Sequence, residues 1–183
     1  VTGWRTAFFR PYRRLEDHMF HFILQLAREH HFPVQLHTGI LAGNGGRITN
    51  TNPTPLTNLF FLYPSIPFDL FHIAYPYQSE LAAMAKLFPN VHANFCWAHI
   101  ISPEVARRTL HEFLDTIPVN KIFGFGGDYN FAELTYGHAR ITRRNITRVL
   151  SEKVQAGDIT EEEALEIATL LLHDNGARLY TRA

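Results

Sequence analysis

The sequence predicts a single α/β domain, residues 1–183, in which short strands alternate with helices. Four short runs rich in apolar and aromatic residues, each bounded by glycine, proline or asparagine, are typical of buried strands. Between them, apolar residues recur at three- and four-residue spacings, as they do on the buried face of a helix. No composition shift, low-complexity tract or sequence repeat divides the chain. This alternation favours a parallel sheet covered by helices.

The first third of the chain predicts one amphipathic helix, one strand and a long polar loop. Met19, Ile23 and Ala27 place apolar side chains on one helical face, and Pro33 ends the helix. A loop this long in a compact domain is often functional. The elements predicted here are a leading segment at 1–14, a helix at 16–30, a strand at 34–37, a loop at 40–52 and a helix at 53–62.

The remainder repeats the same unit and ends in helices. We predict strands at 68–73, 90–96 and 121–125, and helices at 79–87, 103–114, 141–155 and 160–173. Gly157 ends one helix, and Thr160 with Glu163 forms a capping box for the next. A strand followed by a helix therefore occurs four times. This predicts half of a TIM-type (β/α)8 barrel with extra C-terminal helices.

The composition excludes several classes of protein. The chain is 46% hydrophobic, which is unlike a disordered protein, and seventeen basic residues balance seventeen acidic ones. That balance gives no electrostatic signature of nucleic acid or an anionic membrane as a partner. Cys96 is the one cysteine, and no run in the given sequence is long enough to span a membrane. We expect no signal peptide, because the first residues lack a basic start followed by an apolar run. We predict a cytoplasmic protein that acts on a small molecule; a homo-oligomer is left open.

Three of the predicted strands end in a residue that can bind a metal or move a proton: His37, His72 and Asp128. Because the carboxyl ends of parallel strands meet at one edge, we expect these side chains to lie close together. Imidazole and carboxylate are common ligands of catalytic zinc, which lowers the pKa of its bound water. For any one of them, a structural histidine or a solvated aspartate after a glycine-rich turn is the alternative. Together they predict a metal site in which a carboxylate beside the metal-bound water can accept its proton.

The order of these motifs resembles the C-terminal half of the amidohydrolase superfamily. The matching motifs are His37-Thr-Gly39, Phe71-His72-Ile-Ala-Tyr-Pro-Tyr77, Phe125-Gly-Gly-Asp128-Tyr129 and Asn175-Gly-Ala-Arg-Leu-Tyr180. The resemblance implies strands five to eight of a barrel, with a metal at strand-end ligands His37, His72 and Asp128. It also implies that Asp128 and His72 are catalytic, as groups that transfer protons. It implies hydrolysis of a C–N or C–O bond by metal-activated water, with zinc preferred to manganese or iron. A decarboxylase or a uronate-type isomerase is the alternative within the family.

The sequence departs from the family at the first strands. The family's His-x-His pair on strand one has no counterpart, because His30 and His31 are adjacent and predicted at a helix end. We therefore expect the chain to be the C-terminal part of a longer protein and to be inactive alone. The alternatives are a half barrel that pairs with a second copy, and an inactive fragment used for binding or assembly.

Three further residues are predicted to bind substrate. Arg47, in the glycine-rich loop, suits a substrate carboxylate, although a solvated loop arginine is the alternative. Tyr75 follows His72, where Pro76 could equally set a turn. Trp97 follows the third strand, where an aromatic residue could equally serve packing.

Overall fold

The computed structural model describes residues 10–43 and 45–181, so the first nine residues of the predicted leading segment lie outside it. Arg10 to Arg14, predicted to be irregular, belong instead to the first described helix. The helices are α2 (Arg10–Glu29), α3 (Thr57–Leu62), α4 (Gln78–Leu87), α5 (Ala98–Ile101), α6 (Pro103–Thr116), α7 (Ala132–Ala156), α8 (Glu161–Thr169) and α9 (Asn175–Tyr180). Short 3-10 turns cover Ile48–Thr51, Thr54–Leu56, His72–Ala74 and Val119–Lys121, and a π-helical turn covers Leu170–Asp174.

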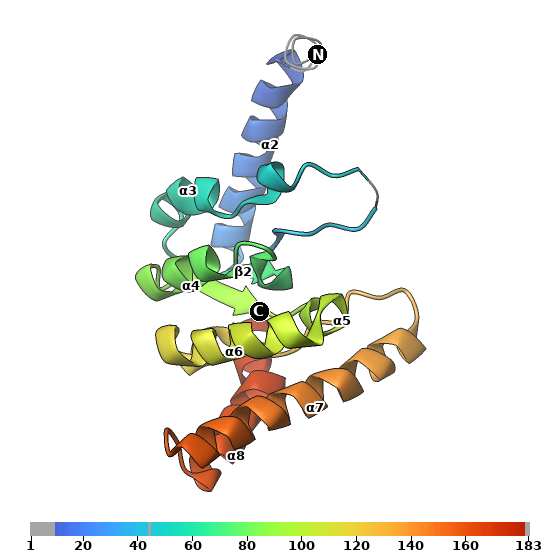
Figure 1. Ribbon diagram of the computed structural model, residues 1–183. Helices are drawn as coiled ribbons and strands as arrows, with labels where there is room; N and C mark the ends of the chain where they lie inside the picture. The colour runs from blue at the N-terminus through green and yellow to red at the C-terminus, as the bar shows by residue number, and fades with distance from the viewer. Residues whose placement is uncertain (1–9, 44, 182–183) are drawn as a thin grey trace.

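Four parallel strands form one sheet in chain order: β1 (Val34–His37), β2 (Phe68–Phe71), β3 (Val91–Asn94) and β4 (Ile122–Phe123). Figure 1 shows the helices following one another in the same order, from α2 at the top to α7 and α8 at the bottom. Each strand therefore leads through helices to the neighbouring strand, as in a TIM-type barrel.

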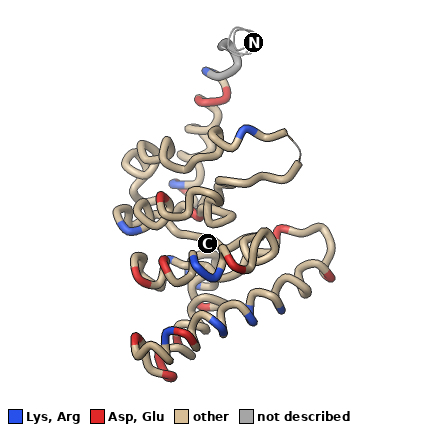
Figure 2. Tube along the Cα trace, in the orientation of Figure 1, with Lys and Arg blue, Asp and Glu red and all other residues tan. Residues whose placement is uncertain are grey.

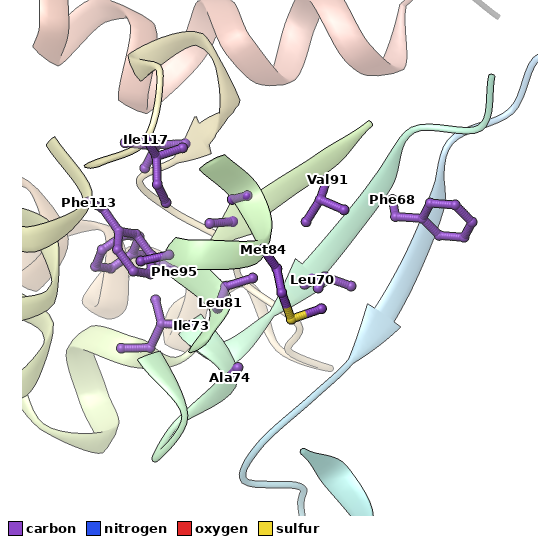
Figure 3. Packing of buried hydrophobic residues seen from close by; sticks show 14 of the residues in the cluster. Phe68, Leu70, Ile73, Ala74, Leu81, Met84, Val91, Phe95, Phe113 and Ile117 are labelled. Carbon is purple, nitrogen blue, oxygen red and sulfur yellow. The ribbon is translucent and has the colours of Figure 1, made fainter. Parts of the chain in front are cut away.

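The hydrophobic core lies between the sheet and the helices. Phe68 and Leu70 of β2 point to this side and are fully buried, as is Val91 of β3. Leu81 and Met84 of α4 pack over them (Figure 3). Strand β2 is buried along its whole length, whereas Gln35 and His37 of β1 are exposed on the face opposite the core.

Capping residues in the sequence set the helix ends. Ser102 accepts a hydrogen bond from the amide of Val105, and Pro103 begins α6. Gly157 takes φ +81 after α7, and Thr160 and Glu163 form the predicted capping box of α8.

Charged side chains join the outer helices. The Glu152 carboxylate of α7 accepts hydrogen bonds of 2.8 Å from Arg107 and 2.7 Å from His111, both on α6. Figure 2 shows the charged residues on the outer helices, with basic residues following one another along α7.

The boundaries of some predicted elements were wrong. The strand predicted at 68–73 ends at Phe71, because His72, Ile73 and Ala74 all take positive φ. The strands predicted at 90–96 and 121–125 keep only Val91–Asn94 and Ile122–Phe123, because the chain then leaves the sheet. Helix α7 begins at Ala132 rather than at 141; its first turns carry exposed apolar residues and Gly137, which obscure the helical periodicity.

Among the described residues, no helix combines the length and the apolar character needed to cross a membrane.

Candidate metal centre

The structure brings His37, His72 and Asp128 together at the carboxyl edge of the sheet. Each offers one ligand atom, and these atoms all lie within 4.8 Å of one another. His37 ends β1, His72 directly follows β2, and Asp128 follows the glycine-rich segment after β4. His72 is fully buried, whereas His37 and Asp128 are exposed. The site is therefore closed at the His72 side and open to solvent at His37 and Asp128.

The hydrogen bonds of His72 set which of its nitrogens carries the hydrogen. Its Nδ1 lies 3.1 Å from the carbonyl oxygen of Cys96, and its Nε2 lies 2.9 Å from Nδ1 of His37. Because a carbonyl oxygen only accepts, Nδ1 carries the hydrogen and Nε2 keeps its lone pair. Burial lowers the pKa of His72, and the opposing effect of the Cys96 carbonyl is smaller. Burial therefore favours the neutral imidazole of His72, whose Nε2 faces His37.

Glycines allow the segment before Asp128 to lie close to its neighbours. A Cβ on Gly124 would come within 2.9 Å of the side chain of Ile146, and one on Gly126 within 2.8 Å of Asn94 Oδ1. Asp128 itself takes φ +51, a conformation that aspartate tolerates better than most residues. The indole nitrogen of Trp97 donates to the carbonyls of Gly127 and Asp128, at 3.1 and 3.2 Å. The carboxylate is thus presented by a constrained turn.

These three residues fit a divalent metal ion. One ligand atom from each of the three residues lies within 4.8 Å of the other two, which is near enough for all three to share one ion. Two imidazoles and one carboxylate form a donor set that zinc, manganese and iron all accept. With three protein ligands, at least one position stays open for water.

The three residues predicted to bind substrate occupy different surroundings. Arg47 is exposed and, with Gly39, Ile48 and Thr51, lines a surface pocket of about 380 Å³ in the loop after β1. Tyr75 is half-buried at the end of the turn that carries His72. Trp97 is half-buried with its ring centroid 4.8 Å from that of His72. Their contact with substrate stays a prediction.

A polar layer beneath the site, with Asp69 buried at its centre, was missed from the sequence. Asp69 pairs in register with Gln35 on one side and His92 on the other, so all three lie on the sheet face opposite the core. Asp69 Oδ2 accepts from Asn94 Nδ2 at 2.9 Å and from the hydroxyl of Tyr180 in α9. Gln35 Nε2 donates to the same hydroxyl at 2.9 Å. An acid inside the apolar run of β2 was the available signal, but its partners lie far along the chain.

Burial raises the pKa of Asp69 from 3.8 to about 6, against the opposing hydrogen bonds from Tyr180, Asn94 and Gln35. Asp69 loses its proton at a lower pH in the unfolded chain than in the folded protein. The free energy of unfolding therefore falls by about 3 kcal/mol as the pH rises from about 4 to about 6. Asp69→Asn should therefore gain about that much free energy of unfolding relative to wild type when pH rises from 4 to 7.5. Urea unfolding at both pH values measures this change. Asp17→Asn, at an exposed acid, is the control, and parallel pH profiles for Asp69→Asn and wild type would contradict the expectation.

A parallel sheet with its strands in chain order, covered by helices and carrying imidazole and carboxylate side chains at its carboxyl edge, is typical of (β/α)-barrel proteins that have their active site at that edge. The chain matches the amidohydrolase family over residues 8–182 and belongs to that family. It is 32% identical over 149 residues to protein fluG of Emericella nidulans, a match that covers 81% of this chain and 17% of fluG.

Solved structures share the fold. A structure assigned as a metal-dependent hydrolase from Lactobacillus casei ATCC 334 superposes with a TM-score of 0.78 at 20% identity, covering 92% of this chain and 44% of the hydrolase. A uronate isomerase from Bacillus halodurans C-125 superposes with a TM-score of 0.69 at 20% identity, covering 86% of this chain and 40% of the isomerase. These likenesses confirm the predicted partial TIM-type barrel. The chain spans less than half the length of each of these proteins.

Proposed function

We propose that this chain forms one half of the active site of a metal-dependent hydrolase that cleaves a C–N or C–O bond. The observation that carries the proposal is the convergence of His37, His72 and Asp128, whose ligand atoms lie within 4.8 Å of one another. Membership of the amidohydrolase family supports it. A bound divalent ion, with zinc our first choice, would supply a water of lowered pKa.

The residues of this chain have separate roles in the proposed reaction. His72 supplies the Nε2 lone pair from the buried base of the site, and His37 supplies a second imidazole at the mouth. Asp128 is exposed beside them, where its carboxylate can accept a proton and pass it to the leaving group. Arg47, on the loop that follows β1, would bind an anionic group of a small-molecule substrate, and Tyr75 and Trp97 would line the substrate-binding site.

We further propose that the remaining strands of the barrel come from a longer protein, called here the full-length protein. The chain spans 44% of the hydrolase it resembles. Helix α2 also exposes Met19, Phe22 and Ile23, an apolar face that further barrel elements would bury. The chain alone should then be inactive; a second copy completing the barrel is the alternative. A cytoplasmic location remains a proposal from the single cysteine.

Isomerisation of a uronic acid is the second candidate, favoured by the fold shared with a uronate isomerase. Assays of the full-length protein with amide, ester and lactone substrates and with uronic acids would separate the two candidates. We expect turnover that a chelator abolishes and a divalent metal restores. Turnover unaffected by complete metal removal would overturn both candidates, whereas product from uronic acids alone would select the isomerase.

A further inference from the structure

The turn at the end of β3, residues Asn94 to Trp97, supplies no predicted metal ligand. It nevertheless contacts two of the three predicted ligands, His72 and Asp128. The Cys96 carbonyl accepts from His72 Nδ1 at 3.1 Å. The Trp97 indole donates to the carbonyls of Gly127 and Asp128 at 3.1 and 3.2 Å. This turn therefore lies between the two ligands and touches both.

Asn94 fixes the turn with both ends of its amide. Its Oδ1 accepts from the amide nitrogen of Cys96 at 2.8 Å, and its Nδ2 donates to Asp69 Oδ2 at 2.9 Å. Since the Cys96 N–H can only donate, the amide of Asn94 cannot be reversed. Asn94 is 5% exposed and Asp69 is fully buried, so water does not compete for these bonds.

The hydrogen bonds continue beyond Asp69 to the last helix. Tyr180 of α9 donates to Asp69 Oδ2, and Gln35 of β1 donates to Tyr180. On the other side, a Cβ on Gly126 would lie 2.8 Å from both Asn94 Oδ1 and Cys96 Cβ. The glycine segment that leads to Asp128 thus rests directly on the turn that Asn94 holds.

We propose that Asn94 is a positioning residue of the metal centre. By holding Cys96, it directs the Cys96 carbonyl to His72 Nδ1 and so keeps the hydrogen on that nitrogen, leaving Nε2 free to bind a metal. Asp69 holds the amide of Asn94, and Tyr180 holds Asp69. The metal role of His72 rests on the proposed function, but the choice of its tautomer does not.

Exchanging the side chains at positions 69 and 94 tests this proposal. Asn94→Asp keeps an acceptor for Cys96 but removes the donor to Asp69 and places two carboxyl groups together. We expect repulsion between the two carboxylates to turn the side chain at position 94 away from Cys96, so that the fixed tautomer of His72 is lost. The double variant Asp69→Asn/Asn94→Asp restores a donor and an acceptor in reversed order, with the second hydrogen of the amide introduced at position 69 directed at the Tyr180 oxygen. We expect it to restore the tautomer.

The first readout is the ¹⁵N NMR spectrum of the His72 ring in the metal-free full-length protein, which reports the protonated nitrogen directly. The second is the Kd for Co²⁺, from absorption titration. Asn94→Asp should weaken Co²⁺ binding about 10- to 100-fold, the usual effect of losing such an outer hydrogen bond, and the double variant should recover most of it. Asn120→Asp, at an exposed asparagine near the opposite end of the sheet, is the control and should change neither readout.

A folded Asn94→Asp protein that keeps the Nδ1–H tautomer of His72 would overturn the proposal. If that variant does not fold, the double variant decides: a folded protein with the Nδ1–H tautomer supports the proposal, and one without it overturns the proposal. Failure of wild type to bind Co²⁺ would instead count against the proposed function, since the tautomer is measured without metal.

Discussion

Asp128→Asn in the full-length protein is expected to lower kcat by about 10²- to 10⁴-fold, the range typical for loss of a general acid–base group. The amide cannot accept a proton, and it is a poorer ligand than the carboxylate. The fold should remain intact for two reasons. Asp128 is exposed, and asparagine adopts its positive φ of 51° as readily as aspartate does.

Steady-state kinetics measure the loss of activity, and circular dichroism verifies the fold. Asp17→Asn changes an exposed acid on α2 and should leave kcat unchanged. An Asp128→Asn protein with wild-type turnover would remove the carboxylate from the proposed chemistry, and the catalytic role assigned to this residue would be wrong.

Gly39→Ala should lower the free energy of unfolding by about 3 kcal/mol or more, through both backbone strain and overlap. Gly39 takes φ +70, and a Cβ there would lie 2.3 Å from the carbonyl oxygen of Tyr75 and 2.4 Å from the carbonyl carbon of Ala74. Both atoms belong to the backbone of the turn that carries His72, so neither can rotate away. This close approach lies at the ends of β1 and β2, where His37 pairs in register with Phe71, the residue before His72.

Gly46→Ala is the matched control for this substitution. It lies in the same loop, its φ is not positive, and an added Cβ would meet nothing within 4 Å. We expect it to change stability by less than about 0.5 kcal/mol, as at other open surface sites. Urea unfolding of both variants provides the comparison. Equal stability of Gly39→Ala and Gly46→Ala would show that the two strand ends do not pack as described.

The parallel sheet and its metal-binding edge could be predicted because both follow from local sequence. Each strand is a short apolar run, and the carboxyl ends of parallel strands must share an edge, so topology alone placed His37, His72 and Asp128 together. The capping box of Thr160 and Glu163 is equally local. Family membership, expected from the motif order, is confirmed.

The features that were missed depend on distant parts of the chain. Tyr180 lies 111 residues from Asp69, and no local pattern connects them. The positioning role of Asn94 has no local signal, because it depends on the backbone of Cys96 and on the side chain of Asp69. Positive φ at His72, Ile73 and Ala74 shortened β2, although the apolar run itself suits a strand. Packing at the site, rather than propensity, sets these conformations.

The metal content of the full-length protein, measured beside that of this chain alone, tests the central claim most directly. We expect a stoichiometric divalent ion in the full-length protein, its loss in the His72→Ala variant, and little metal in this chain alone. Stoichiometric, tightly bound zinc in this chain alone would contradict the proposal that the chain forms only half of the active site. Undiminished metal in the His72→Ala variant would contradict the metal centre itself.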